Sequence, residues 1–339
     1  MLSRSLCVAI ALAAASPACA DLVVLQYHHI NDQTPASTST EVELFRAHLK
    51  RIEALGIEVV PLASGTRAAL AGELQDRQQV AISFDDAYDS VWTTAAPLLD
   101  AHGYPYTIFV NTRAVGSPGY MTWEQLEQAA DRPQVTIANH SHDHAHLPRK
   151  TGESREQWRK RTEQTLDRAQ ALLQEKLGVN EPLFAYPYGE YDSGVETLVD
   201  ERDWFGYGQQ SGAIGEHSDP SRLPRFPMAT AYGQLEGLDT KLQSRALPVD
   251  ASQLPDGIVT VNPPVLAMTL PRRLEPSTLT CFASGQGRIP VQADGQKVNV
   301  EAPKAFDSRR FRYNCTYPAG NGRFYWLSQQ WVDLDQPED

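Results

Sequence analysis

Apolar runs and helical stripes alternate along residues 21–248. Short apolar runs predict buried strands, and apolar residues spaced three and four positions apart predict helices, several of them ended by glycine. The expected strands are Leu22–Leu25, Ile57–Val60, Val80–Phe84, Tyr106–Val110, Val135–Ala138, Leu183–Tyr186 and Phe205–Tyr207. The expected helices are Glu41–Leu55, Ser90–His102, Trp123–Ala130 (capped by Thr122) and Glu153–Leu177. This alternation predicts a parallel α/β sheet, either open or closed into a barrel.

The pattern changes at about residue 250. Beyond it, turns rich in Gly, Pro, Asn and Asp separate short β-rich runs, and no long helical period occurs. The expected strands include Val259–Val261, Leu279–Phe282 and Phe324–Leu327. We predict a small all-β sandwich over residues 250–339, following an α/β domain over residues 21–249.

Seven aromatic residues of the second domain have two possible roles. They either fill the core of the sandwich or form an exposed face that stacks on sugar rings. These residues are Phe311, Tyr313, Tyr317, Phe324, Tyr325, Trp326 and Trp331. The second domain is therefore a candidate for contact with a glycan or a protein.

Residues 1–20 have the pattern of a secretory signal peptide. Arg4 precedes an apolar run of about ten residues, and small residues follow at the positions that a signal peptidase reads. This run is too short to cross a hydrocarbon core about 30 Å thick. A lipoprotein would use Cys19, but the residues before it are a poor lipobox. We expect cleavage before Asp21 and an exported protein, periplasmic or secreted, without a membrane span.

The net charge limits which partners the protein can bind, and the cysteine content indicates the compartment in which it folds. Asp and Glu number 42 against 30 Lys and Arg, which gives a formal net charge of −12. This balance argues against binding to nucleic acid or to an anionic membrane surface. Without the signal peptide only Cys281 and Cys315 remain. Two cysteines in an exported chain predict one disulfide, and two buried free thiols are the alternative.

Three short segments that follow predicted strands concentrate reactive side chains. They are Ser83–Ala87, Asn139–His146 and Phe184–Gly189. In parallel α/β folds the active site lies at the carboxyl ends of the strands. In the first segment Asp85 and Asp86 are adjacent, and neighbours in an extended chain point in different directions. One of these carboxylates can therefore bind a metal while the other faces a substrate.

The second segment predicts a metal site. Four of the nine histidines lie between His140 and His146, directly after a predicted strand. His140 and His144 are four residues apart and can face one ion. With a carboxylate from elsewhere they would form a His-His-Asp site that leaves positions open for water and substrate. The places of His142 and His146, at the site or in solvent, are left open.

In this order the segments resemble the motifs of polysaccharide deacetylases with a NodB homology domain, carbohydrate esterase family four. Residues 83–86 match its Thr/Ser-Phe-Asp-Asp motif, and residues 140–144 match His-Ser/Thr-x-x-His. Residues 185–189 match Arg-x-Pro-Tyr/Phe-Gly, except that Ala185 replaces the arginine. Residues 25–30 and 222–226 also resemble the subgroup that deacetylates exported poly-N-acetylglucosamine. The resemblance covers about residues 22–248 and implies a distorted (β/α) barrel.

The resemblance implies a metal-dependent hydrolase that removes N-acetyl groups from an extracytoplasmic amino-sugar polysaccharide, such as poly-N-acetylglucosamine, peptidoglycan or chitin. Asp86, His140 and His144 would bind one divalent ion, usually zinc, with cobalt or nickel as alternatives. Asp85 would be the general base that activates water. The main-chain N–H of Tyr188 would stabilise the oxyanion.

Two departures from the family pattern affect the catalytic assignment. Arg225, from another loop, is the expected substitute for the missing arginine of the third motif. The late Leu-x-His motif, whose histidine is the family's general acid, has no match, since residues 226–260 contain no histidine. His28 is favoured as the acid over His29, His142 and His217. Because loss of a general acid costs about 10²–10⁴-fold in rate, two alternatives stay open. These are an O-acetyl polysaccharide esterase and a carbohydrate-binding protein with a vestigial metal site.

Overall fold

The computed structural model describes residues 20–74 and 77–338, so the predicted signal peptide lies outside the described residues except for Ala20. The helices are α1 (Val42–Ala54), α2 (Leu62–Leu70), α3 (Ala96–His102), α4 (Trp123–Ala130), α5 (Arg155–Leu177), α6 (Ser193–Asp200) and α7 (Leu238–Leu242). A π-helical turn covers Val91–Ala95, and 3-10 turns cover Pro187–Gly189, Ala251–Gln253 and Pro276–Thr278.

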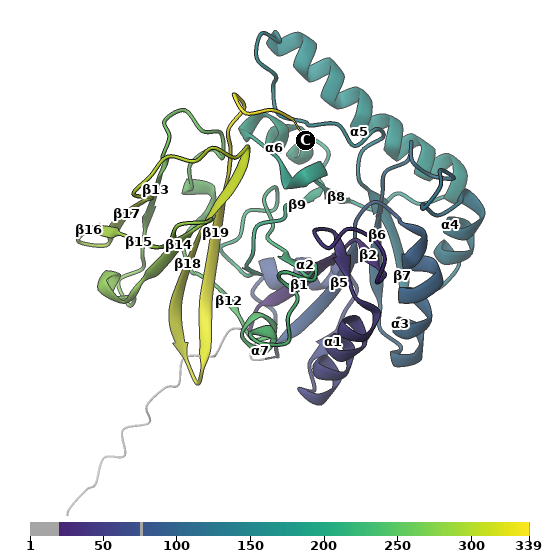
Figure 1. The fold of residues 1–339 in the computed structure, drawn as a ribbon, viewed down its shortest axis with the longest axis horizontal. Coiled ribbons are helices and arrows are strands. Elements are labelled where there is room, and N and C mark those ends of the chain that lie inside the picture. The colour runs from purple at the N-terminus through teal and green to yellow at the C-terminus, as the bar shows by residue number, and fades with distance from the viewer. Residues whose placement is uncertain (1–19, 75–76, 339) are drawn as a thin grey trace, which may run out of the picture.

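The strands fall into an N-terminal and a C-terminal set (Figure 1). The first set is β1 (Leu22–Tyr27), β2 (His29–Ile30), β3 (Ser39–Thr40), β4 (Glu58–Val59), β5 (Gln79–Phe84), β6 (Tyr106–Val110), β7 (Val135–Asn139), β8 (Leu183–Ala185), β9 (Phe205–Tyr207), β10 (Ala213–Ile214) and β11 (Phe226–Pro227). The second set is β12 (Arg245–Ala246), β13 (Val265–Thr269), β14 (Thr280–Ala283), β15 (Gly287–Ile289), β16 (Val291–Asp294), β17 (Lys297–Glu301), β18 (Arg310–Gly320) and β19 (Arg323–Val332).

The α/β part is built on a curled nine-stranded sheet in the order β10-β1-β5-β6-β7-β8-β9, with β11 also beside β1 and β4 beside β5. Its strand pairs are parallel except β1–β10. Helices α1, α3, α4 and α5 lie on the side of the sheet away from the C-terminal β sheets (Figure 1). The predicted α/β barrel is confirmed as a curled half-barrel, whose parallel strands bring their carboxyl ends to one edge.

Both faces of the central strands are buried, which explains their nearly continuous apolar sequences. In β1, Leu22 and Val24 pack in one hydrophobic cluster together with Phe109 of β6. Val23 and Leu25, which point the other way, pack in a second cluster with residues of the helices. The interior of the half-barrel is therefore filled by side chains.

Local capping explains where α4 and α5 begin and where α5 ends. Thr122 caps α4 as predicted, accepting a hydrogen bond from the Gln125 N–H in a capping box. Ser154 caps α5 in the same way, and Gly178 ends it in the left-handed conformation with φ 68°. Sequence reasoning missed α2 and α6. Both are about as short as α4, but α2 has no side-chain cap like Thr122, and the cap that Asp192 gives α6 was not recognised.

The C-terminal β region, which we define as residues 245–338, contains two sheets. One has the order β12-β19-β18-β14-β15 and the other β13-β17-β16. Their pairs are antiparallel except β12–β19, which confirms the predicted all-β character. The predicted strand Val259–Val261 is wrong, and only the neighbouring Ile258 forms a β-bridge. Val261 is 70% exposed, and the prolines that follow it lack the N–H needed for a ladder.

The aromatic residues of this region do not form an exposed face. Phe311, Tyr313 and Trp331 are buried in its core. The other four are half-buried. Among them, Trp326 packs edge-on against Phe226 of β11, with ring centroids 5.2 Å apart. One of these rings therefore contacts the α/β part.

The predicted disulfide joins Cys281 and Cys315, which lie opposite each other on β14 and β18. Its two cysteines are 34 positions apart in sequence, so the bond closes a loop in the unfolded chain. We expect the Cys281→Ala/Cys315→Ala double variant to lose about 3–4 kcal/mol of stability on the chain-entropy estimate. Urea unfolding of variant and parent checks this, and equal midpoints would contradict it.

Within the described part of the chain, no helix is both long enough and apolar enough to cross a bilayer.

Candidate active site

The predicted site residues meet at the carboxyl edge of the curled sheet. His28 follows β1, Asp85 and Asp86 follow β5, and His140 follows β7. Tyr188 lies in the 3-10 turn after β8. Because these strands are parallel, segments distant in sequence reach the same edge.

Asp86, His140 and His144 form a compact group of three metal-ligand atoms that all lie within 4.8 Å of one another. The Asp86 Oδ1 atom is 3.4 Å from the His144 Nε2 atom and 3.7 Å from the His140 Nε2 atom. Ligand atoms about 2.0–2.2 Å from one tetrahedral ion would be about 3.3–3.6 Å apart. The spacing therefore fits a single ion held by two imidazoles and one carboxylate.

His140 supplies the clearest sign of a metal. Its Nδ1 atom is 2.7 Å from the main-chain oxygen of Ala185, to which it donates, so its Nε2 lone pair is directed elsewhere. His140 is fully buried, and its Nε2 atom has no hydrogen-bond partner among the described residues. A buried polar atom without a partner is costly, and a cation beside Asp86 would remove that cost.

The charge states of the three side chains also suit a cation. Burial lowers the pKa of His140 to about 3 and that of His144 to about 4, so both imidazoles are neutral at physiological pH. Burial raises the pKa of Asp86 to about 6, and the nearby Asp85 charge adds to this effect. A buried carboxylate that is hard to ionise alone is stabilised by a positive ion.

The backbone around the site is held in an uncommon conformation. Asp86, Ala87, Ser141, His144 and Tyr188 all have φ between 52° and 71° without being glycine. Such residues cost free energy and persist where the surrounding contacts over-determine them, which is frequent at functional sites. Three of the five, Asp86, His144 and Tyr188, are predicted site residues.

Asp85 is fully buried and pairs with Arg225. Two guanidinium nitrogens of Arg225 donate to the two Asp85 oxygens over 2.7 and 2.8 Å, and both side chains are fully buried. Gln26 donates a third hydrogen bond, over 2.8 Å. Burial raises the pKa of Asp85, but the charge and hydrogen bonds of Arg225, together with the neighbouring histidines, outweigh burial and hold this pKa well below its usual range. Asp85 is therefore ionised at neutral pH.

The four histidines considered as proton donors differ in their positions relative to Asp86. The His28 Nε2 atom is 4.0 Å from an Asp86 oxygen. His29 stacks on Tyr88, with centroids 3.6 Å apart, and the His142 Nδ1 atom bonds the Thr112 hydroxyl over 2.9 Å. His217 lines a small cavity against the C-terminal β region. Of the four, His28 is the one that the structure brings to the Asp86 carboxylate.

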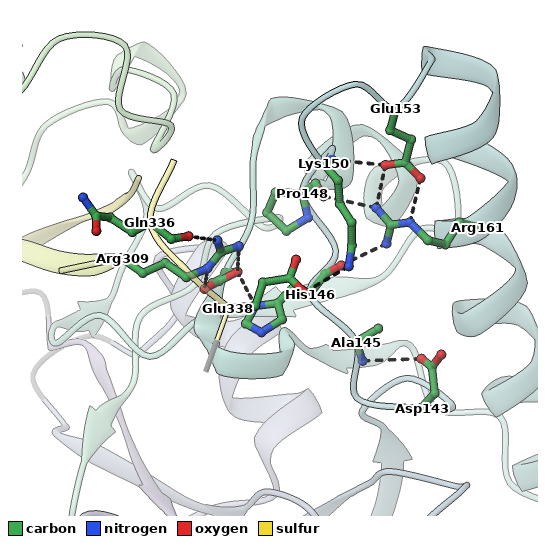
Figure 2. A network of polar contacts seen from close by, with 11 residues as sticks. Asp143, Ala145, His146, Pro148, Lys150, Glu153, Arg161, Arg309, Gln336 and Glu338 are labelled. Carbon is green, nitrogen blue, oxygen red and sulfur yellow. Dashed lines mark hydrogen bonds and ion pairs between the residues drawn. The ribbon is translucent and has the colours of Figure 1, made fainter. Parts of the chain in front are cut away.

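His146 belongs to a second polar group beside the site. Its Nδ1 atom is 2.7 Å from a Glu190 oxygen, and its ring lies parallel to that of Tyr188 at 4.0 Å. Glu190 is fully buried and also accepts hydrogen bonds from Arg309 and Arg310 of the C-terminal β region. Figure 2 shows the polar network around His146 and Arg309.

Sequence reasoning missed Gln26 and Glu190. Gln26 carried a signal, because it is the one polar side chain in the buried strand Leu22–Tyr27. Glu190 directly follows the third motif, but its partners lie about 120 residues further along the chain. No spacing in the sequence could indicate that contact.

The hydrogen bonds to Glu190 predict an acid-sensitive contribution to stability. Burial raises its pKa, but hydrogen bonds from His146 and Arg309 outweigh this and lower the pKa from 4.5 to about 2. This difference corresponds to about 3 kcal/mol of stability, present above pH 4.5 and lost as the pH falls towards 2.

Glu190→Gln should therefore be less stable than the parent by about 3 kcal/mol at pH 7, with the gap closing between pH 4.5 and 2. Urea unfolding across this pH range measures the gap. Glu175→Gln, at an exposed position of α5, is the matched control. A gap independent of pH would contradict the prediction.

Comparisons with known proteins agree with this geometry. Residues 73–203, which include both aspartates, the histidine-rich segment and Tyr188, match the family model "Polysaccharide deacetylase". The chain is 25% identical to the Bacillus subtilis protein YxkH over 179 residues, which are 53% of this chain and 60% of YxkH. It is 22% identical over 226 residues to the poly-beta-1,6-N-acetyl-D-glucosamine N-deacetylase of Staphylococcus epidermidis, covering 60% of this chain and 78% of that protein.

A solved structure shows the same fold. IcaB from Ammonifex degensii superposes with a TM-score of 0.56 at 21% identity, over 65% of this chain and 94% of that one. The residues that match the family model, 73–203, contain strands β5 to β8 of the curled sheet and the group Asp86, His140 and His144. Over residues 73–203, the chain therefore belongs to the polysaccharide deacetylase family.

Proposed function

We propose that the protein is a metal-dependent hydrolase that removes N-acetyl groups from an extracytoplasmic amino-sugar polysaccharide. One observation carries this proposal. The group Asp86, His140 and His144 lies beside a separate carboxylate, Asp85, that Arg225 keeps ionised. A Lewis-acid site adjacent to a fixed base is the arrangement that amide hydrolysis by water requires.

The proposed roles follow from where each side chain points. Asp86, His140 and His144 would hold a divalent ion, for which we propose zinc because two neutral imidazoles and a carboxylate suit it. When bound, such an ion supplies a Lewis acid that polarises a carbonyl and acidifies water. Asp85 takes the proton from the attacking water. A carboxylate accepts about four hydrogen bonds, and three sites of Asp85 are occupied, so one remains for water.

Proton donation to the leaving nitrogen is assigned to His28. Its Nε2 atom is 4.0 Å from an Asp86 oxygen, whereas Asp85 is bonded by Arg225. An acid and a base held on two separate side chains can serve the leaving group and the water separately. The main-chain N–H of Tyr188 is the proposed donor to the oxyanion.

The substrate class is argued from the relatives and from the disulfide. The Staphylococcus epidermidis relative is named for deacetylation of poly-beta-1,6-N-acetyl-D-glucosamine, and we propose a polymer of this kind here. The disulfide between Cys281 and Cys315 supports an oxidising, extracytoplasmic location. We keep the proposed division into signal peptide (1–20), deacetylase domain (21–249) and C-terminal β domain (250–339).

Acetate release tests the proposal. Mature protein stripped with a chelator and reloaded with zinc is incubated with N-acetylglucosamine oligomers. We expect release that requires the metal and disappears in His140→Ala. Metal binding without release from these oligomers, but with release from acetylated xylan, would replace the proposal by an O-acetyl esterase. Binding of oligomers without release from either substrate would replace it by a carbohydrate-binding function.

A further inference from the structure

The C-terminal β region reaches the turn that carries Tyr188. Arg309 donates to both oxygens of Glu190, over 2.8 and 3.1 Å, and Arg310 donates to one of them over 2.9 Å. Gln330 of β19 donates from its side-chain amide to the main-chain oxygen of Gly189. Residues 189 and 190 are thus bonded to two strands of the C-terminal sheet.

From Glu190 the contacts continue to the proposed catalytic groups. His146 bonds Glu190 on one side, and its ring lies flat against the Tyr188 ring, with 2° between the planes. The guanidinium of Arg310 lies 5.2 Å from the centre of the Tyr188 ring. Tyr188 in turn meets His144 edge-on, with ring centroids 4.5 Å apart. A continuous set of contacts therefore links Arg309 and Arg310 to a proposed metal ligand.

We propose that Arg309 and Arg310 are positioning residues for catalysis, which act through Glu190 and His146 to hold Tyr188 in its working orientation. The C-terminal β region then contributes to catalysis, because it supplies residues that position the turn carrying Tyr188. This inference rests on the proposed function, in which the Tyr188 N–H meets the oxyanion.

The conformation of Tyr188 explains why such support is needed. Its φ of 58° is unfavourable for a residue with a side chain, so neighbouring contacts must fix it. Its own turn is three residues long and contributes two main-chain hydrogen bonds, from Gly189 to Tyr186 and from Glu190 to Pro187. The two arginines also neutralise the buried Glu190 charge, and so keep the carboxylate ionised as an acceptor for His146.

The segment that carries His146 is held from the same side. Glu338, near the C-terminus, pairs with Lys150 at 3.0 Å, and Arg309 also donates to the main-chain oxygen of Gln336 (Figure 2). Arg161 of α5 donates to the main-chain oxygen of His146 over 2.9 Å. Contacts from residues 336 and 338 and from α5 thus fix the loop that carries His146, on which the contacts between Glu190 and Tyr188 depend.

Full-length mature Arg309→Met and Arg310→Met test the proposal, with Arg288→Met as the matched control. Arg288 is an exposed arginine on β15 of the same region. Each variant is loaded with zinc, its metal content and folded fraction are measured, and kcat and KM for N-acetylglucosamine oligomers are determined. Hydrogen exchange of the peptide covering residues 186–190 is followed in parallel.

We expect kcat per metal-loaded, folded molecule to fall by about 10²-fold, because a misplacement of about 1 Å at a reacting centre has this effect. KM and metal content should stay at parental values, since the lost contact would act in the transition state. Exchange of residues 186–190 should become faster in both variants, and Arg288→Met should match the parent. If Arg309→Met does not fold, Arg310→Met tests the same contact, because its side chain is 27% exposed.

The contrary outcomes are distinct. Parental kcat in both variants, or a fall that lost metal or unfolded protein explains fully, would overturn the positioning role. Unchanged exchange of residues 186–190 would show that Arg309 and Arg310 do not hold the turn that carries Tyr188, whatever the activity. A parent protein that binds metal but is inactive would instead refute the proposed function, and with it the catalytic role of Arg309 and Arg310.

Discussion

Asp85→Asn should remove nearly all turnover while leaving the metal site intact. Asparagine keeps the size of aspartate but cannot take a proton from water. Removal of a general base costs about 10²–10⁴-fold in kcat. Asp85 lies outside the group of metal-ligand atoms formed by Asp86, His140 and His144, so metal content should not change. Asp85→Asn is therefore expected to lose turnover and to keep its metal.

The neighbouring aspartates supply the controls for this experiment. Asp86→Asn should lose metal affinity and turnover together, because it weakens a ligand. Asp89→Asn, four residues beyond Asp85 in the same loop, should keep both. Acetate release and zinc content are measured for all three variants against the parent. Loss of zinc in Asp85→Asn, or parental turnover in it, would refute the assignment of Asp85 as the base.

The asparagine also has a structural cost that must be separated from catalysis. Arg225 and Gln26 both donate to Asp85, and an asparagine amide would turn a donor towards one of them. Arg225 would remain buried without its counter-charge, at a cost of about 3–5 kcal/mol. Turnover must therefore be measured at a temperature where the variant is folded, and expressed per folded molecule.

The sequence indicates much of the metal site because its residues lie in local segments. Asp86 is next to Asp85, and His140 and His144 are four positions apart, so short-range spacing predicts which side chains can share an ion. The strands before them are buried on both faces and therefore read as continuous apolar runs. Local pattern and parallel topology together bring these segments to one edge of the sheet.

Contacts between distant segments could not be predicted in the same way. The pairing of Glu190 with Arg309 depends on how the C-terminal sheets pack against the turn after β8, and residues 190 and 309 carry no pattern that marks it. The strand predicted at Val259–Val261 fails for a related reason. Its apolar residues suit a strand, but contact with β19 stops at Val259, whose N–H bonds the Val332 oxygen, and Val261 is exposed.

Arg225→Met should lower both stability and turnover, and the two effects should depend on pH in opposite ways. The arginine donates to both oxygens of a fully buried carboxylate. Its removal leaves that charge with Gln26 as its remaining side-chain donor among the described residues. Breaking a buried pair in this way costs about 3–5 kcal/mol at neutral pH.

The direction with pH follows from the pKa of Asp85. In the parent this pKa lies below its usual range, so the ion pair stabilises the fold above about pH 4, and this contribution is lost as the pH falls below it. In the variant, burial still raises the pKa while the charge and hydrogen bonds of Arg225 are gone, so the neutral acid is favoured over its state in the parent. The stability gap between parent and variant should therefore be widest near pH 7 and should narrow towards pH 3. Turnover of the variant should instead recover as the pH rises, because Asp85 must ionise to act as a base.

Arg222→Met is the matched control for this substitution. Arg222 lies three residues earlier and pairs with the buried Glu196 at 2.5 Å, away from Asp85. This variant should also lose stability, but its turnover per folded molecule and its pH profile should stay those of the parent. Denaturant unfolding and acetate release between pH 5 and pH 9 measure the two effects. Identical pH profiles of turnover for Arg225→Met and Arg222→Met would show that Arg225 contributes to folding alone. A shift confined to Arg225→Met would make the arginine the group that keeps the catalytic base ionised, in place of the one missing at Ala185.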